Sequence, residues 1–178
     1  MGEILVHEFA TLDGVINAPT WTMDFGFDPK MGEAIAELMG RCRAILLGRK
    51  TYEMFAPVWS QRTAEDDPGA PFFNDTPKHV VSSTLQEAAW QNTELVAYDA
   101  VPALKERVEG GIYISGSGTL VRALLADGLV DELHLFRYPL LAGEGPRLYD
   151  GAAPLGLELA RLEQYENGAV YTVYTPVS

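Results

Sequence analysis

The sequence predicts an α/β fold with a mostly parallel central sheet, flanking helices and an antiparallel hairpin near the C-terminus. Strand and helix patterns alternate from one end of the chain to the other. The run from Cys42 to Leu47 is short and mainly apolar, as expected of a strand that is buried on both faces. Two long strand-like runs near the end of the chain are separated by Asn167-Gly168, a dipeptide typical of tight hairpin turns.

The first half of the chain contains three expected strands, at residues 4–10, 42–47 and 78–83. Between the first two, Ile35, Leu38 and Met39 can share one face of a helix over residues 31–39. Gly48 ends the second strand, and a short helix is expected to begin at Lys50 or Thr51. The polar residues 11–29 and the Pro-, Asp- and Gly-rich residues 57–77 predict two long loops.

The second half of the chain continues the alternation. Strands are expected at 94–98, 111–115 and 131–138, and helices at 102–109 and 119–126. Pro102 suits the first turn of its helix, where a backbone N–H is not needed. The hairpin strands are expected at 157–165 and 169–174. Because no linker or repeat interrupts this pattern, we expect residues 1–178 to form a single domain.

The composition is that of a folded protein with a strongly acidic charge. Hydrophobic residues make up 47% of the chain, charged residues 21%, and the formal net charge is −12. With 13 Lys and Arg against 25 Asp and Glu, we expect no nucleic-acid partner. The chain shows neither a membrane-length apolar run nor a signal-peptide pattern, and the lone Cys42 cannot form an internal disulfide or, alone, a metal site. We therefore expect a cytoplasmic protein with no membrane association and no bound metal.

Three expected strand ends carry residues suited to anion binding. Leu46–Thr51 places a glycine, two cations and a hydroxyl between a strand and a helix, where glycine allows close backbone approach and the helix N-terminus offers free N–H groups. Ser82 and Ser83 end a second strand, and Gly116-Ser117-Gly118-Thr119 leads from a third into a helix. Ligands of α/β sheets bind at the carboxyl ends of the strands, so we expect one shared ligand site.

Several common motifs are absent from the sequence. Val121 stands where the dinucleotide-binding fingerprint has its third glycine, and there is no P-loop. There is also no Gly-x-Ser-x-Gly elbow or metal-spaced Cys/His cluster to indicate hydrolysis or metal catalysis.

The motifs at the strand ends resemble those of dihydrofolate reductases. Gly48-Arg49-Lys50-Thr51-Tyr52-Glu53 is similar to their Gly-Arg-Lys/His-Thr-aromatic-Glu segment. Val81-Ser82-Ser83 is similar to their second cofactor strand, and Gly116-Ser117-Gly118-Thr119 to their glycine pair. The stretch Leu12–Pro19 resembles the mobile loop that covers nicotinamide in that fold.

The later part of the chain looks more like the reductase domain of riboflavin biosynthesis and the stand-alone bacterial proteins of that superfamily. The segments that carry this resemblance are Ser115–Gly118, Leu129–Leu133, Pro139 and Gly143–Tyr149. The two resemblances together cover nearly the whole chain in order. They imply a dihydrofolate-reductase-like fold and, as an expectation for the family, a homodimer.

The resemblance implies that NADPH binds across the strand ends. The adenosine phosphates would lie at residues 48–51 with the 2′-phosphate near 82–83, the pyrophosphate at 116–120, and the nicotinamide against the first strand and the loop after it. A local cationic pocket on an acidic protein favours NADPH over NADH. The implied cofactor-binding residues are Ala10, Thr11, Ile16, Gly48, Arg49, Lys50, Thr51, Ser82, Ser83, Gly116, Ser117, Gly118, Thr119 and Leu120.

The substrate side of the expected site is less defined. Dihydrofolate reductases use a carboxylate near the start of the first helix to bind the pterin and assist its protonation. Trp21 matches an aromatic residue of those enzymes, and at the spacing from it at which they have the carboxylate this chain has Gly26. Asp24 and Asp28 are nearby. We take Asp28 as the candidate catalytic residue, although Asp before Pro also suits a turn or a helix cap. Trp21 is the candidate wall of the substrate site.

These features favour an NADPH-dependent reductase that transfers hydride to a small pyrimidine- or pterin-like substrate. Two alternatives stay open. One is the riboflavin-pathway 5-amino-6-(5-phosphoribosylamino)uracil reductase proper, which requires phosphate-dependent substrate binding. The other is a nucleotide-binding protein without turnover, because the expected carboxylate is not at its usual position.

Overall fold

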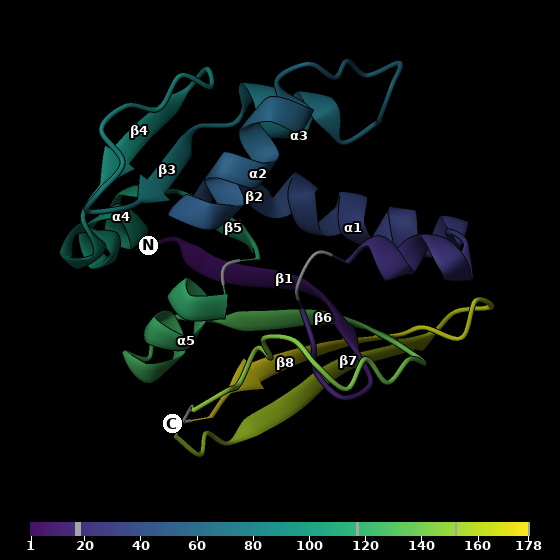
Figure 1. Ribbon diagram of the computed structural model, residues 1–178. Coiled ribbons are helices and arrows are strands. Elements are labelled where there is room, and N and C mark those ends of the chain that lie inside the picture. Colours follow the sequence, from purple (N-terminus) through teal and green to yellow (C-terminus); the bar gives the residue numbers. More distant parts are fainter. Residues whose placement is uncertain (17–18, 117, 152, 178) are drawn as a thin grey trace.

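The computed structural model describes residues 1–16, 19–116, 118–151 and 153–177 (Figure 1). The strands are β1 (Glu3–Thr11), β2 (Cys42–Gly48), β3 (Lys78–Val81), β4 (Thr93–Val96), β5 (Gly111–Ser115), β6 (Glu132–Tyr138), β7 (Leu157–Gln164) and β8 (Val170–Pro176). The helices are α1 (Pro29–Arg41), α2 (Arg49–Trp59), α3 (Ala70–Asp75), α4 (Val101–Arg107) and α5 (Gly118–Ala126), with 3₁₀ turns η1 (Thr20–Phe25) and η2 (Tyr98–Ala100).

All of these strands join in one sheet with the order β4-β3-β2-β5-β1-β6-β8-β7. The pairs from β4 across to β6 are parallel, and β8 pairs antiparallel with both β6 and β7. The predicted fold class, a mostly parallel α/β sheet with a C-terminal antiparallel hairpin, is therefore confirmed. In the hairpin turn, Gly168 adopts the left-handed φ of +86° and Tyr165 N–H donates to Ala169 O at 2.9 Å.

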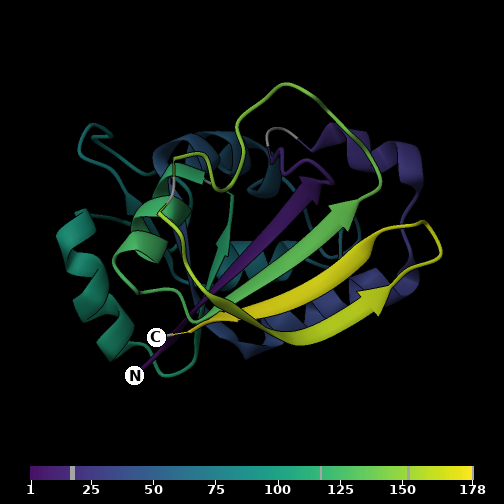
Figure 2. The ribbon, with the colours of Figure 1, turned by 90° about the horizontal axis from the view of Figure 1, so that it is seen from below.

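Helices cover both faces of the sheet, and each face has its own apolar core. On one face α1, α2 and α3 pack on the sheet through residues that include Leu5, Leu38, Ile45, Tyr52 and Phe73. On the other face α4 and α5 pack through residues that include Val6, Leu46, Leu104, Ile114 and Leu124. Burial of such side chains stabilises the fold by roughly 1.5–3 kcal/mol each. Figure 2 shows that none of the described helices lies in front of β8 and β7, so this end of the sheet is bare of helices on the α5 side.

The strand β1 lies near the middle of the sheet, and its pairing changes along its length. With β5 it pairs only from Glu3 to His7, which lies opposite Ser115. With β6 it stays paired as far as Thr11. From Glu8 onward, one edge of β1 therefore has no partner strand, because the chain turns away at the end of β5.

Two short helices form where long loops were predicted. In η1, Trp21 and Phe25 pack edge-on against Tyr138 at ring-centroid distances of 5.2 and 5.4 Å. In α3, Phe73 stacks on Trp59 at 4.3 Å. These contacts join segments far apart in the sequence, so local residue preferences did not reveal them.

The strand β3 is shorter than predicted because Ser82 begins a turn. Its hydroxyl accepts hydrogen bonds from Thr84 N–H at 3.2 Å and Leu85 N–H at 2.9 Å. The strand ends at Val81 as a result. None of the described helices has the length and apolar character of a transmembrane span.

Candidate functional site

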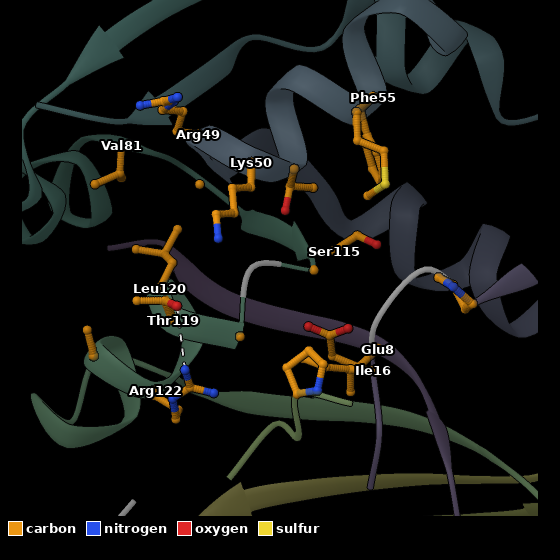
Figure 3. A pocket seen from close by; sticks show the side chains of 18 of the residues that line it. Glu8, Ile16, Arg49, Lys50, Phe55, Val81, Ser115, Thr119, Leu120 and Arg122 are labelled. Atoms are coloured by element: carbon orange, nitrogen blue, oxygen red, sulfur yellow. Dashed lines mark hydrogen bonds between the residues drawn. The ribbon is translucent and has the colours of Figure 1, made fainter. Parts of the chain in front are cut away.

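A cavity of about 720 Å³ lies at the carboxyl ends of β1, β2, β3 and β5, between α2 and α5 (Figure 3). This volume is in the range of small-molecule sites, roughly 300–1,000 Å³. The cavity occupies the sheet edge at which parallel α/β proteins bind ligands. The three predicted anion-binding segments thus converge on one space, although they lie far apart in the sequence.

The structure brings together most of the predicted cofactor residues around this cavity. Those that line it are Ile16, Gly48, Arg49, Lys50, Thr51, Gly116, Gly118, Thr119 and Leu120. Ser117, which was also predicted, lies outside the described residues.

Four other predicted cofactor residues are not part of the described lining. Ala10 and Thr11 are buried in β1, where Thr11 Oγ1 donates to Asp13 Oδ1 at 2.5 Å and accepts from Val15 N–H at 3.0 Å. Ser82 and Ser83 follow Val81, whose side chain does line the cavity. A role for these four residues in cofactor binding stays a prediction.

Positive charge gathers at the cavity, although the protein as a whole is acidic. Arg49 and Lys50 come from the first turn of α2, and Arg122 comes from α5 on the opposite wall (Figure 3). The Arg49 guanidinium donates to Glu53 Oε1 at 2.9 Å and to Thr84 Oγ1 at 2.8 Å. Arg122 was not predicted, but it follows Gly118 by four residues and therefore shares its helix face. Such a cluster favours an anionic ligand.

The turn between β5 and α5 brings the backbone close to the cavity. Gly116 has a φ of +76°, and a Cβ there would meet Thr51 Oγ1 at 3.3 Å. A Cβ on Gly118 would meet Ile16 Cδ1 at 2.8 Å. The left-handed φ favours glycine at Gly116, whereas a Cβ at Gly118 would meet only the end of a flexible side chain; Gly118 is the first residue of α5. A helix N-terminus with this open backbone suits a phosphate or pyrophosphate group.

Glu8 is a lining residue that the sequence analysis missed. Its side chain is buried, with only 4% of the residue exposed, and it is the one acid among the described residues of the lining. Gly116 N–H donates to its carboxyl group, while its Oε1 atom has no hydrogen-bond partner among the described residues. Burial raises the pKa of Glu8 to about 8. The sequence feature that could have identified Glu8 is an acidic residue within a mainly apolar strand.

The loop after β1 is tied to the segment that resembles riboflavin reductases. Asp13 accepts hydrogen bonds from Ala142 N–H at 3.1 Å and Gly143 N–H at 2.8 Å, and Arg147 Nε donates to Asp13 O at 2.9 Å. The Thr11 hydroxyl and these N–H groups lower the pKa of Asp13 to about 2. The two motifs therefore form one structure at the mouth of the site.

The predicted catalytic residue, Asp28, is not among the described lining residues. It caps α1 by accepting from Lys30 N–H at 2.9 Å, and it also accepts from Glu166 N–H at 2.9 Å in the hairpin turn. This position explains Asp28 as a structural residue, and its catalytic role stays a prediction without geometric support.

Trp21, the predicted substrate wall, is also outside the described lining and packs on Tyr138. Its neighbour Pro19 does line the cavity. Contact between Trp21 and a substrate therefore stays a prediction.

The strand order, the cavity at the carboxyl ends of the strands and the cationic first turn of α2 define a dihydrofolate-reductase-like α/β protein. The family described as "RibD C-terminal domain" matches residues 3–171 of this chain. The chain belongs to this family.

Comparisons with individual proteins agree with this assignment. The chain is 27% identical to the uncharacterized protein YyaP of Bacillus subtilis (strain 168), over 96% of this chain and 93% of that protein. It also resembles a structure from Shewanella sp. PV-4 whose name refers to riboflavin biosynthesis, with a TM-score of 0.81 and 21% identity over 99% of both chains.

Two further structures share the fold at lower identity. The first is a diaminohydroxyphosphoribosylaminopyrimidine deaminase/5-amino-6-(5-phosphoribosylamino)uracil reductase from Thermotoga maritima, with a TM-score of 0.72 and 17% identity over 99% of this chain and 57% of that chain. The second is dihydrofolate reductase from Enterococcus faecalis, complexed with NADP(H), with a TM-score of 0.62 and 14% identity over 99% of this chain and 97% of that chain. The expected dihydrofolate-reductase-like fold is confirmed.

Proposed function

We propose that this protein is an NADPH-dependent reductase of small pyrimidine- or pterin-like substrates. The observation that carries the proposal is the cavity at the strand ends, where Arg49 and Lys50 of α2 line the wall opposite Arg122 and the N-terminus of α5, on a protein of net charge −12. A dinucleotide with an additional phosphate supplies the negative charge that this arrangement favours. Membership of a family related to reductases supports the same conclusion.

The described residues fit such a cofactor. Arg49, Lys50 and Thr51 would hold its adenosine phosphates, and the backbone from Gly116 to Leu120 would hold its pyrophosphate. The close approach of the backbone to the cavity at Gly116, where φ is +76°, supports this assignment. When bound, the nicotinamide supplies a hydride to the substrate. The protein's part is to orient the substrate, exclude water and supply a proton.

The names of two structural neighbours support the proposed substrate class. The Thermotoga maritima relative bears the name of a 5-amino-6-(5-phosphoribosylamino)uracil reductase, and the Enterococcus faecalis structure is a dihydrofolate reductase. Both names refer to substrates that carry a fused or simple pyrimidine ring. We propose the uracil derivative as the first acceptor to assay and 7,8-dihydrofolate as the second.

The cofactor preference is tested by titrating the protein with NADPH and NADH while following tryptophan fluorescence. We expect micromolar NADPH binding and much weaker NADH binding. The Arg49 guanidinium donates a hydrogen bond to Thr84, beside Ser82 and Ser83, and of the adenosine phosphates we assign it the 2′-phosphate, which NADH lacks. Arg49→Ala should therefore weaken NADPH binding roughly 10- to 100-fold and leave NADH binding unchanged, because a charge-assisted contact contributes about 1.5–3 kcal/mol.

Arg107→Ala is the matched control, because Arg107 is 69% exposed on α4 and does not line the cavity. It should leave both affinities unchanged. Equal losses for NADPH and NADH in Arg49→Ala would remove the assigned role of Arg49. Binding of neither nucleotide to the wild-type protein would overturn the proposed function.

We also propose that the chain forms a homodimer through the bare face at β7. Leu157, Leu159 and Leu162 are 38%, 49% and 63% exposed, and their partners in β8 place them on the same face of the sheet. None of the helices in the described part of the chain covers this face (Figure 2). An exposed row of leucines on an edge strand is typical of a contact surface.

The double substitution Leu159→Lys, Leu162→Lys should therefore convert a dimer into a folded monomer in sedimentation-velocity runs at micromolar concentration. Leu141→Lys is the control, because Leu141 is 70% exposed and lies in the loop after β6, outside β7. A wild-type protein that sediments as a monomer would contradict the proposed interface.

A further inference from the structure

Glu8 lies at the point where β1 and β5 separate. The two strands pair as far as His7 and Ser115, and the next residue of each chain segment borders the cavity. Glu8 therefore stands at the inner end of the site, on the strand edge that has no partner. A side chain at this position faces whatever ligand enters between the two strands.

The surroundings of Glu8 leave its carboxyl group open to the cavity. Figure 3 shows Glu8 beside Ile16, with its carboxyl group directed toward the turn that follows Ser115. Gly116 N–H donates to the carboxyl group, and its Oε1 atom is buried without a partner among the described residues. Buried polar atoms are usually paired, so an unpaired oxygen at a cavity wall indicates a ligand contact.

No described cation neutralises Glu8. Of the ionisable groups near Glu8, Tyr113 on β5 has its side chain on the opposite face of the sheet, where its hydroxyl forms a hydrogen bond with His7 Nδ1. The others are Tyr149 in the segment after β6 and, around Tyr149, Arg137 on β6 and Tyr174 on β8. Arg137 donates instead to Thr172 Oγ1 at 3.5 Å and to Tyr174 Oη at 3.2 Å. Across the cavity lie Lys50 and Arg122. A buried carboxyl group without an ion-pair partner is stable in its protonated form.

The other proton-bearing side chains of the lining either form hydrogen bonds with other protein groups or lie where the cofactor phosphates are proposed to bind. The Tyr98 hydroxyl donates to Asp127 Oδ2 at 2.6 Å. Arg49 and Lys50 lie at the start of α2, and Arg122 donates to Arg147 O at 2.9 Å. Asp28, at the start of α1, does not line the cavity.

We propose that Glu8 is the catalytic residue that donates the proton in the reduction, an inference that rests on the proposed reductase function. The substrate atom that receives this proton is the nitrogen or oxygen of a polarised C=N or C=O bond. Because the donor is neutral, it can approach that atom closely without placing a second negative charge beside an anionic ligand.

In this reduction the carbon of the C=N or C=O bond would receive a hydride from NADPH, the reductant of the proposed function. The electron pair of that bond moves to the nitrogen or oxygen, which takes the proton from the Glu8 carboxyl group. Glu8 is left as a carboxylate and regains a proton from water once product has left.

Two variants separate this role from a role in packing. Glu8→Gln keeps the shape of the side chain and a hydrogen-bond donor but has no proton to give, whereas Glu8→Asp keeps a carboxyl group that is one methylene shorter. The matched control is Glu3→Gln, the same change on the same strand, at a side chain that is 56% exposed. The acceptors are 5-amino-6-(5-phosphoribosylamino)uracil and 7,8-dihydrofolate.

We expect Glu8→Gln to slow single-turnover NADPH oxidation about 100-fold or more, the usual size of a general-acid effect. We expect the wild-type rate to fall above about pH 8, where Glu8 loses its proton, and this fall to be missing from the residual activity of Glu8→Gln. Glu8→Asp should retain that pH dependence at an intermediate rate. The dissociation constant for NADPH should change less than threefold in both variants, and Glu3→Gln should match the wild type.

A second readout needs no turnover. The infrared spectrum of the unliganded protein at pH 6 should contain the C=O stretch of a buried protonated carboxyl group. This band should be missing from Glu8→Gln, disappear from the wild type above about pH 8, and shift when NADPH or an acceptor is added.

The possible failures can be told apart. Wild-type rates and pH dependence in Glu8→Gln, or no Glu8-dependent band, would overturn the assignment of Glu8 while leaving the reductase function intact. A wild-type protein that does not bind NADPH, or reduces neither acceptor, would overturn the proposed function itself, and the role of Glu8 with it.

Discussion

Replacing Glu8 with glutamine is expected to make the protein more stable at alkaline pH. The difference in unfolding free energy between Glu8→Gln and the wild type should grow by about 4 kcal/mol in favour of the variant from pH 5 to pH 9. Burial raises the pKa of Glu8 from 4.5 in the unfolded chain to about 8 in the fold. The folded protein therefore holds this proton more tightly than the unfolded chain does.

The sign of the effect follows from this difference. Below pH 4.5 both states carry the proton, and the stabilisation is complete. As the pH rises toward 8, the unfolded chain loses the proton first, so the equilibrium moves toward unfolding. Glutamine does not titrate, so the unfolding free energy of the variant does not fall with pH for this reason.

Urea denaturation of both proteins at several pH values between 5 and 9 measures the effect. His7, the neighbour of Glu8 on β1, has the opposite influence, because burial lowers its pKa to about 3 and its contribution is lost on acidification. This contribution is common to both proteins and cancels in the difference. Glu3→Gln should show no such trend, and a flat difference for Glu8→Gln would mean that Glu8 is ionised in the fold at neutral pH.

Replacing Lys78 with methionine is expected to destabilise the fold by about 3 kcal/mol. Lys78 is fully buried, and its ammonium group donates to the carbonyl oxygens of Phe73 at 2.8 Å, Asn74 at 3.1 Å and Thr76 at 2.9 Å. These acceptors lie at the end of α3, where helical carbonyls lack partners within the helix. The ammonium also lies over the Trp90 ring, 4.6 Å from its centroid.

Methionine matches the length of the aliphatic stem but leaves the three carbonyl oxygens without this donor. We expect the melting temperature to fall by roughly 10 °C, which scanning calorimetry measures directly. Lys30→Met is the control, because Lys30 is exposed on α1, and its melting temperature should stay close to that of the wild type. A change of less than 1 kcal/mol in Lys78→Met would mean that water replaces the ammonium group at the end of α3.

The candidate site was predictable where its residues belong to a local pattern. Residues 48–51 follow a strand and begin a helix. Gly116 and Gly118 lie in a tight turn that leads into a second helix. Both segments therefore predicted an anion site. Arg122 became part of the site only because α5 packs across the cavity from α2. Glu8 escaped prediction because it lies within a strand and does not follow one.

The sequence by itself determined the alternation of strands and helices, the terminal hairpin and the anion-binding turns, because periodicity, glycine and turn residues act over a few neighbouring positions.

Only the tertiary structure decided which strands pair and where they part. The contact between His7 and Tyr113 joins residues separated by 106 positions, and no local pattern specifies it. The same pairing leaves the edge of β1 open at Glu8. The short helices η1 and α3 likewise depend on aromatic contacts with distant elements. Burial, and with it the pKa of Glu8, follows from that assembly and not from the residue type.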